Sequence, residues 1–382
     1  ADGAAVDASE ATLTYRSGEE GGTLSFADSR ELGAFVFDSQ GTVSSASVGK
    51  SATLSAGELS FAASANRGAE MSGAGTLAVG KISVNNTRSG NEISVGTLEL
   101  TQAETEISVA RNGSLEISSD EIVFSDGVED GTLVKTGAGT LTVGDAFQDD
   151  FAGSLSVEAG TVSTNLLNLS GALTLAAGTT FDGSVDASAG SSVGLGAGAR
   201  IDGDLTLTGA TATLGEATVT GDLTASGSEM TFNGTVSGIG TLTWGDGNGI
   251  DLGEAFRAEI SSAGNGVLLD FNVGLDGDGN ALTEDFDFDF DASALADSFL
   301  GRDVDLVYNE KDTSIEIVVT GALVWNETVA HWTVSGAGSS GHEHDQWDVV
   351  TRDGVSEESA FFENGDFVQF TTAGSTRLVG TV

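Results

Sequence analysis

Short runs that alternate apolar and polar residues cover residues 11–250, and glycine, asparagine, serine or aspartate separates one run from the next. Within a run the apolar residues are two positions apart, as Leu98 and Leu100 are, and the residues between them are mainly threonine, serine and glutamate. Side chains two positions apart lie on one face of a β-strand, so the pattern predicts short strands with one buried face. Clear examples are Gly96–Thr101, Gly113–Ser118, Gly171–Ala176 and Gly203–Thr208.

The spacing of these runs predicts a solenoid. They recur at intervals of roughly 17 to 30 residues, the length of one coil in solenoid proteins, and many share a Gly-x-Leu-x-Leu/Ile pattern that lets like residues stack in successive coils. A β-sandwich, the alternative, would show more hairpin turns of the Asn112-Gly113 type, and helical periodicity is hard to find. We therefore predict an all-β, right-handed parallel β-helix over residues 1–250.

One motif is more specific than the others. Leu133–Val143 reads Leu-Val-Lys-Thr-Gly-Ala-Gly-Thr-Leu-Thr-Val, a second glycine-containing run follows at Phe151–Val162, and weaker echoes occur at Met71–Val79 and Val236–Trp244. These residues resemble the autotransporter-associated β-strand repeat of the passenger regions of bacterial surface proteins. The resemblance implies a secreted, surface-displayed right-handed parallel β-helix.

The pattern changes over residues 251–320, which are acidic and carry longer spacers. We predict a capping segment here that ends in a hairpin with strands at Val304–Tyr308 and Ser314–Thr320, because an exposed end coil is an open sheet edge that needs a cover. Residues 321–382 contain the run Phe361–Phe370, which resembles the Phe-x-Asn-Gly-Asp-x-Val-x-Phe signature that opens further β-helix segments in the same passenger family. We expect this part to be the Trp-containing start of a further β unit.

The composition limits the classes of partner. The chain has 58 acidic and 14 basic residues and a formal net charge of −44. Binding to nucleic acid or anionic lipid requires lysine and arginine to neutralise phosphates, so we expect neither partner. No run of about 18 apolar residues is present, and no transmembrane helix is expected. Cysteine and proline are both absent, and proline is disfavoured in strands because it cannot donate a ladder hydrogen bond.

An acidic stretch near residue 280 is a candidate calcium site. Asp276-Gly-Asp-Gly-Asn280 places oxygen ligands at the first, third and fifth positions of a calcium loop. The sixth position is Ala281 instead of the glycine that such loops use, so an ordinary acidic turn is the alternative. The residues that we expect to supply ligands are Asp276, Asp278, Asn280, Glu284 and Asp287.

For the other candidate residues we expect structural or surface roles and not catalysis or ligand binding. Enzymes that cleave glycans use paired carboxylates, but the adjacent Asp149 and Asp150 would point to opposite faces of a strand. Arg200 and Asp202 share a face and are expected to form a surface pair. The histidine pair His342 and His344 is expected in a polar loop, with metal binding as the alternative. Three tryptophans are expected in the packing of a cap, with stacking on sugars as the alternative. The tryptophans are Trp325, Trp332 and Trp347.

Together these features predict a non-enzymatic surface protein of a bacterium. In the first interpretation it is a passenger-like structural stalk or an adhesin that binds host or environmental glycans or proteins. In the second it associates with itself into a filament or a surface layer, because the ends of a β-helix are open sheet edges. A polysaccharide-active β-helix enzyme is the third interpretation.

Overall fold

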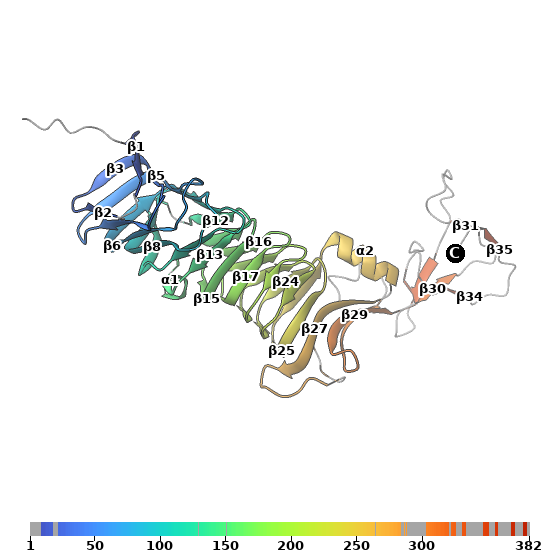
Figure 1. Ribbon diagram of the computed structural model, residues 1–382. Helices are drawn as coiled ribbons and strands as arrows, with labels where there is room; N and C mark the ends of the chain where they lie inside the picture. Colours follow the sequence, from blue (N-terminus) through green and yellow to red (C-terminus); the bar gives the residue numbers. More distant parts are fainter. Residues whose placement is uncertain are drawn as a thin grey trace, which may run out of the picture.

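The computed structural model describes residues 9–17, 22–128, 130–149, 151–263, 265–283, 286, 288 and 303–320, together with six short strands between residues 322 and 379. The part up to β27 is a parallel β-helix that forms a long rod (Figure 1). It has three faces, which we name A, B and C in the order in which the chain visits them. On face A, for example, β16 pairs in parallel with β14 of the preceding coil and with β18 of the following coil. The predicted all-β fold and its parallel coils are confirmed.

The strands divide among the faces as follows; a strand that turns a corner contributes its first or second half. Face A consists of β1 (Thr12–Tyr15), the second halves of β3 (Arg30–Phe37) and β5 (Thr53–Phe61), β7 (Lys81–Val84), β9 (Glu104–Val109), β12 (Thr132–Thr136), β14 (Ser154–Val157), β16 (Ala172–Leu175), β18 (Ser192–Leu195), β21 (Thr211–Leu214), β24 (Glu229–Phe232) and β26 (Gly249–Leu252). Face B consists of β2 (Gly22–Phe26), β4 (Ser44–Val48), the first halves of β6 (Ala69–Val79) and β8 (Asn91–Leu100), β10 (Ser114–Ile117), β13 (Thr140–Val143), the first halves of β15 (Thr161–Leu169) and β17 (Thr180–Ala187), β19 (Arg200–Ile201), β22 (Ala217–Val219) and the first halves of β25 (Val236–Trp244) and β27 (Asn265–Asp276). Face C consists of the first halves of β3 and β5, the second halves of β6 and β8, β11 (Glu121–Phe124), the second halves of β15 and β17, β20 (Leu205–Thr208), β23 (Leu223–Ser226) and the second halves of β25 and β27.

Coils become shorter along the rod as far as β25, and α2 lengthens the last coil, which runs from β25 to β27. In the N-terminal part, hydrogen bonds join neighbouring coils across 22 residues, from Arg16 to Asp38, and across 26 residues, from Ser64 to Asp38. Beyond β14 the separation falls to 18 residues between Thr220 and Asp202. These separations lie inside the interval predicted from the sequence, which is confirmed.

Apolar side chains of successive coils stack in columns inside the rod. Because the strands pair in register, the inward residues of one coil lie directly against those of the next, and no single coil has a core of its own. One column on face A is formed by Val157, Leu175, Leu195, Leu214, Phe232 and Leu252, all at most 3% exposed.

Outward-facing aspartates at one corner join the C-terminal coils. The side chain of Asp204 accepts a hydrogen bond from the backbone N–H of Asp222 at 2.8 Å, and the side chain of Asp222 accepts one from the backbone N–H of Thr241 at 2.7 Å. The repeated Gly-Asp-Leu-Thr sequence therefore supplies both the corner and the acceptor for the next coil.

The C-terminal end of the rod is closed by an antiparallel hairpin and a helix. β27 pairs with β29 (Ser314–Thr320), which pairs with β28 (Asp303–Asn309), as the hairpin prediction required. The helix α2 (Glu254–Ala263) buries Phe256 and Ile260, which are one helical turn apart. Two differences from the expectation stand out: the parallel ladder continues past residue 250 because β27 still pairs in parallel with β25, and α2 was not expected.

The remaining strands form two sheets of their own. A four-stranded sheet contains β30 (Ala322–Trp325), β32 (Trp347–Val350), β33 (Ser356–Glu357) and β34 (Val368–Phe370), and a two-stranded sheet contains β31 (His331–Thr333) and β35 (Arg377–Val379). Trp325 and Trp347 are register partners across β30 and β32. Among the helices in the described residues, none has the length and apolar character needed to cross a membrane.

Candidate functional site

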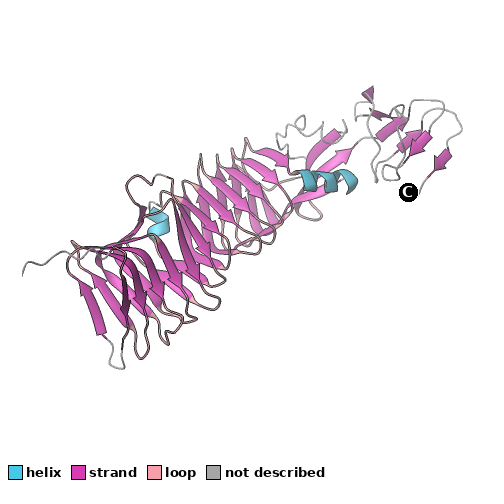
Figure 2. Ribbon diagram, turned by 90° about the horizontal axis from the view of Figure 1, so that it is seen from above, coloured by secondary structure: helices cyan, strands magenta, loops and turns pink. Residues whose placement is uncertain are grey.

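Face C lacks a strand in one coil. Among the described residues β11 pairs only with β8, and the second half of β15 pairs only with β17, so no strand connects β11 to β15 across the intervening coil. That coil forms β12 on face A and β13 on face B, and then the helical turn α1 (Ala146–Asp149) where a face C strand is expected. In Figure 2, α1 stands out from the stacked strands.

Two phenylalanines fill the interior of this coil. Phe147, from α1, is 0% exposed, Phe151 is 2% exposed, and their ring centroids are 4.8 Å apart. Asp145 holds the turn, because its carbonyl accepts the backbone N–H of Gln148 and its carboxylate accepts the side-chain amide of the same residue. The apolar core is therefore continuous where the face C ladder is not.

Phe124, the last residue of β11, reaches into the gap. Its ring centroid lies 6.1 Å from that of Phe151. The ring packs on two glycines of successive coils, Gly131 and Gly153, and a Cβ on either glycine would overlap it. The two glycines thus make the room that lets a half-buried aromatic ring line the break.

Two grooves lie on either side of Ala152, which follows α1 in the coil that lacks a face C strand. The β11 groove, of about 550 Å³, is lined by residues 122–128, by Asp130 and by Ala152. The β15 groove, of about 510 Å³, is lined by Phe151, Ala152, residues 168–170, Asp186 and Ser188. Ala152 is exposed and lines both grooves. Both volumes lie in the range of ligand-binding pockets.

The charges around the grooves have one sign. Asp126 and Asp130 line the β11 groove, Asp186 lines the β15 groove, and all three are exposed. Among the described residues that line the two grooves there is no lysine or arginine. The break is therefore an acidic region with an apolar floor, and it was not predicted, because the run Ala146–Asp149 carries no periodicity that identifies a helix.

Lys135, the lysine of the Lys-Thr-Gly-Ala-Gly-Thr motif, points into the core. It is 0% exposed and pairs with Ile107 and Val157 of the neighbouring coils. Its ammonium donates to the carbonyl oxygens of Thr136 at 2.9 Å, Gly137 at 2.7 Å and Ala159 at 3.0 Å. Burial lowers the pKa of Lys135 to about 8. The motif lysine is thus a structural residue that holds a corner of the coil, and its place two positions after Leu133 was the signal for its inward orientation.

Three of the predicted calcium ligands, Asp276, Asp278 and Asn280, lie at the end of β27 and in the turn that follows it. The carboxylate of Asp276 accepts hydrogen bonds from the backbone N–H of Asn280 at 2.7 Å and of Asp278 at 3.0 Å, and from the Asn280 side chain at 2.9 Å. The bond from the Asn280 side chain is the main cause that lowers the pKa of Asp276. Asp276, Asp278 and Asn280 are thus brought together, and the carboxylate of Asp276 already accepts hydrogen bonds from the other two residues. Glu284 and Asp287 lie outside the described residues. Among the described residues, no group of three or more His, Cys, Asp or Glu side chains could hold a metal ion.

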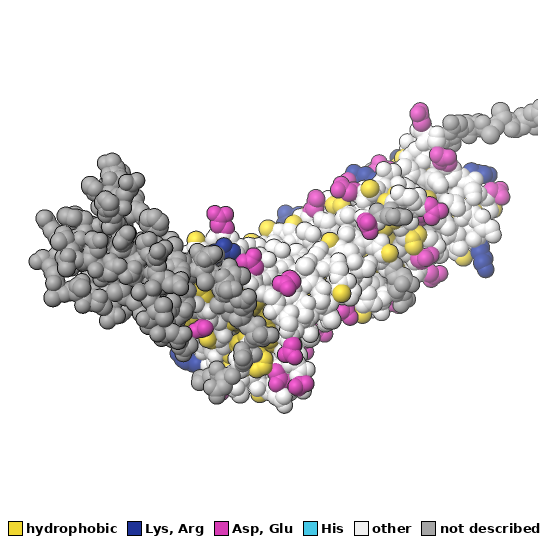
Figure 3. Space-filling view, turned by 180° about the vertical axis from the view of Figure 1, so that it is seen from behind, with side chains coloured by type: hydrophobic (Ala, Val, Ile, Leu, Met, Phe, Trp, Pro, Cys, Tyr) yellow, Lys and Arg dark blue, Asp and Glu magenta, His cyan; other side chains and the backbone are white. Residues whose placement is uncertain are grey.

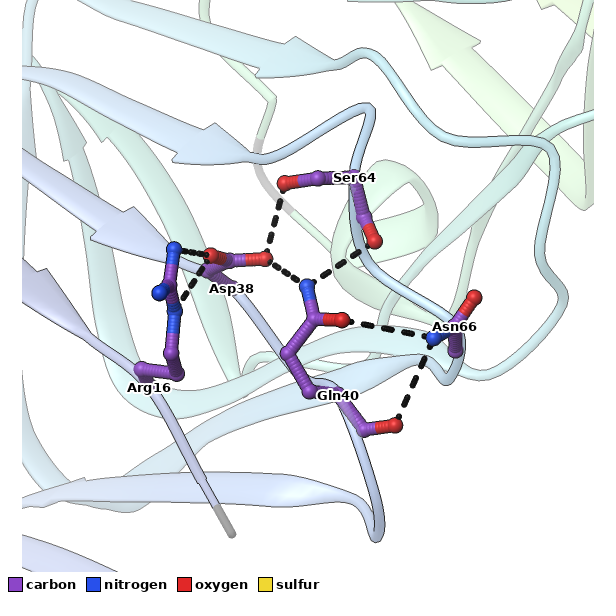
Figure 4. Close-up of polar contacts among 5 residues, drawn as sticks. All are labelled: Arg16, Asp38, Gln40, Ser64 and Asn66. Carbon is purple, nitrogen blue, oxygen red and sulfur yellow. Dashed lines mark hydrogen bonds and ion pairs between the residues drawn. The ribbon is translucent and has the colours of Figure 1, made fainter.

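A buried carboxylate joins three N-terminal coils. Figure 4 shows Asp38, 3% exposed, between Arg16 of the preceding coil and Gln40 and Ser64. Asp38 accepts from Arg16 Nε at 2.7 Å, from Ser64 Oγ at 2.8 Å and from the Gln40 side chain, which in turn contacts Asn66. Burial by itself would raise the pKa of Asp38, but the hydrogen bonds from Ser64, Gln40 and Arg16 outweigh it and lower the pKa below its usual value.

We expect acid to loosen these N-terminal coils through Asp38. Because its folded-state pKa is lowered, the stabilisation is complete above the unfolded pKa of about 4 and is lost as the pH falls through the folded pKa. Asp38→Asn should lower the free energy of unfolding by about 1–3 kcal/mol at neutral pH and weaken the acid dependence. Hydrogen exchange of β1–β5 between pH 7 and 3 measures this, with the exposed Asp28→Asn as the control. An equal response of the two variants would contradict the expectation.

The remaining candidates have surface roles or lie outside the described residues. Arg200 and Asp202 form the expected surface pair, at 2.5 Å with exposed fractions of 45% and 33%. The Asp149 side chain, Asp150, and the histidine pair His342 and His344 lie outside the described residues, as do the side chains of the three C-terminal tryptophans.

Comparisons with protein-family models, with curated proteins and with solved structures find no match to this chain.

Proposed function

We propose that this chain is the rod of a secreted bacterial surface protein, a non-enzymatic stalk or adhesin of the autotransporter-passenger type. The observation that carries the proposal is the parallel ladder of faces A and B, which runs without a break from the first coil to β26 and β27. The motif that underlies the resemblance, with Lys135 inside and glycines at the corner, is a coil-forming element of this ladder.

A rod of this kind projects a binding surface away from a cell. Each coil adds about 4.8 Å of length, and pairing between coils protects the backbone from proteases along the sides. The outward positions carry mainly serine, threonine and acidic residues, and Figure 3 shows acidic side chains scattered over the visible face. The net charge of −44 keeps such a rod soluble and limits nonspecific association.

Antibodies against the purified chain test the location. On intact cells of the source bacterium they are expected to bind, and added protease should remove the signal only slowly, because the coils are hydrogen-bonded along their length. An antibody against a cytoplasmic protein serves as the control for cell integrity. Binding only after permeabilisation would overturn the surface role.

Self-assembly is the second candidate, and the N-terminal end of the rod favours it. Within the described residues β1 pairs only with β3 and β2 only with β4, so their outer edges have no strand partner, and Leu13 of β1 is 36% exposed. An open edge of this kind accepts another strand. Light scattering over a range of protein concentration and salt distinguishes the two candidates: filaments or discrete multimers support assembly, and a monomeric rod in all conditions rules it out.

Calcium binding at the Asp276 turn stays a prediction. Titration calorimetry with calcium alone is expected to show heat that Asp278→Asn reduces, since that change removes one carboxylate ligand. Asp126→Asn, an acidic surface change far along the chain, is the matched control. Equal heats for both variants would leave only an acidic turn.

A further inference from the structure

The coil that carries α1 is joined to its neighbours by strand ladders on two faces instead of three. We call β12, β13 and α1 together the α1 coil. On faces A and B it pairs with β9 and β10 before it and with β14 and β15 after it. On face C, four register pairs join β11 to β8 and four join the second half of β15 to β17, but among the described residues no strand pairing crosses the α1 coil. Two successive interfaces between coils therefore lack one ladder.

Side-chain contacts take the place of the missing ladder. Towards β15, the Asn168 amide donates to the carbonyl of Gln148, and Ser170 Oγ donates to the carbonyl of Phe151 at 3.3 Å. Towards β11, the contact is apolar, with the ring centroids of Phe124 and Phe151 6.1 Å apart. Apolar packing is non-directional. It supplies no row of backbone hydrogen bonds that could share a load between the two coils.

The perimeter of the rod changes at the same place. Register partners are 26 residues apart between β10 and β13, whereas they are only 18 residues apart between β14 and β16. The α1 coil joins the wide coils to the narrow ones, and it fills the core there with Phe147 and Phe151, both at most 2% exposed. The rod thus consists of an N-terminal unit, β1 to β11, and a C-terminal unit, β14 to β29, on either side of the α1 coil (Figure 1).

Tension along the rod loads the interfaces between coils in series. Paired strands are spaced along the hydrogen-bonding direction, which in a stack of coils is the axis of the rod. Every interface therefore carries the same force when the rod is pulled at its ends, and within one interface the ladders share that force. Because the two interfaces of the α1 coil have the fewest ladders, they are expected to open before the others.

We propose that the α1 coil is the point at which the rod yields first under axial tension, so that this coil is drawn out while the N-terminal and C-terminal units stay folded. Once one of its interfaces opens, the α1 coil is held by two ladders alone and its chain extends next. The 30 positions from Phe124 to Ser154 then lengthen the rod by up to about 100 Å.

The proposal deepens the stalk role and rests on that role for its biological meaning. A stalk that yields at a fixed place limits the force on whatever it holds, and it keeps most of its coils folded while it does so. The order in which the coils open is a property of the isolated chain.

The test pulls single molecules of the full chain with optical tweezers. The chain contains no cysteine, so two introduced cysteines at exposed positions attach the handles at chosen places. Ala11→Cys with Lys311→Cys spans the whole rod, and Asp120→Cys with Ala177→Cys spans the α1 coil. The control pairs are positions 11 and 120, within the N-terminal unit, and positions 177 and 311, within the C-terminal unit.

A first step of up to about 100 Å is expected from both pairs of handles that span the α1 coil. Its force should be lower than that of any step from the two control pairs, because every interface inside a unit has three ladders. If the spanning pairs show no such step, or if either control pair yields at the same force, the proposal is overturned.

Phe147→Ala and Phe181→Ala are a matched pair of variants for the same measurement. Both remove a ring that is 0% exposed, but Phe181 lies in β17, which pairs with strands on both sides. At constant force, Phe147→Ala should make the first step about tenfold faster or more, whereas Phe181→Ala should leave the first step unchanged. Equal effects of the two variants on the first step would contradict the proposal.

Circular dichroism confirms that both variants are folded, and the comparison of handle positions stands without either of them. A rod that opens elsewhere would leave its place on the cell surface untouched. The antibody experiment alone decides that location, so failure of the yield point and failure of the proposed function are distinguishable.

Discussion

Replacement of Lys135 by alanine is expected to lower the free energy of unfolding by about 3–5 kcal/mol. The change removes the ammonium that donates to three carbonyl oxygens at one corner, those of Thr136, Gly137 and Ala159. It also leaves a cavity between Ile107 and Val157, because the lysine stem fills that place in an otherwise apolar column. Both losses occur at the coil that borders the break on face C.

Lys135→Met separates the two contributions. Methionine keeps most of the apolar stem and also removes the cost of a buried charge, so we expect a smaller loss of about 1–2 kcal/mol. Chemical unfolding, together with hydrogen exchange of β9 to β15, measures both variants, since a solenoid can lose stability in one region first. Equal losses for alanine and methionine would show that the carbonyl contacts dominate and the packing of the stem contributes nothing.

The pH dependence of the free energy of unfolding, compared between the wild type and Lys135→Met, tests whether the ammonium is buried. Burial lowers the pKa of Lys135 from 10.5 to about 8, so between these values the unfolded chain binds more protons than the folded one and stability rises with pH. From pH 8 to 10.5 the wild type is expected to gain up to about 3 kcal/mol relative to Lys135→Met. A difference between the two proteins that stays constant over this range would contradict the buried position.

Gly137→Ala is expected to destabilise the rod by about 3 kcal/mol or more. Gly137 has a φ of +71°, which L-residues adopt at a cost. A Cβ at this position would also overlap the carbonyl oxygen of Val109 in the preceding coil and lie 2.9 Å from its carbonyl carbon. The neighbouring backbone cannot move away without opening the ladder between the two coils.

Gly178→Ala is the matched control for this change. Gly178 has the same φ of +71°, but a Cβ there would meet nothing within 4 Å. Its loss of about 1 kcal/mol should therefore report the backbone conformation alone. The difference between the two variants, measured by unfolding and by hydrogen exchange of β9 to β13, gives the cost of the clash between coils. If the two losses are the same, contact between coils does not limit this position.

The strands and the closing hairpin were predictable because each depends on local order. Alternation with a period of two places Leu205 and Leu207 on one face whatever the rest of the chain does. The hairpin at the end of the rod likewise followed from two short alternating runs around the turn at residues 309–313. The helix α2 also had a local signal, since Phe256 and Ile260 are four positions apart, but the run is short and follows a long series of strands.

The acidic turn shows the limit of spacing arguments. Asp276, Asp278 and Asn280 have the separations of calcium ligands, and the chain does bring them together. What spacing did not show is that Asp276 already accepts three hydrogen bonds within the turn. The same oxygen atoms serve a metal ion or the backbone, and only the conformation of the turn decides between them.

The sequence by itself determined that this chain forms stacked parallel coils and how acidic their surface is. Only the tertiary structure decided that Lys135 lies beneath a corner, that α1 replaces a strand on face C, and that Ala152 lines two grooves. The period of two in a strand arises from the backbone of that strand alone. The register between coils depends on the lengths of distant corners and on which side chains fill the common core, and these contacts exist only after the coils have stacked.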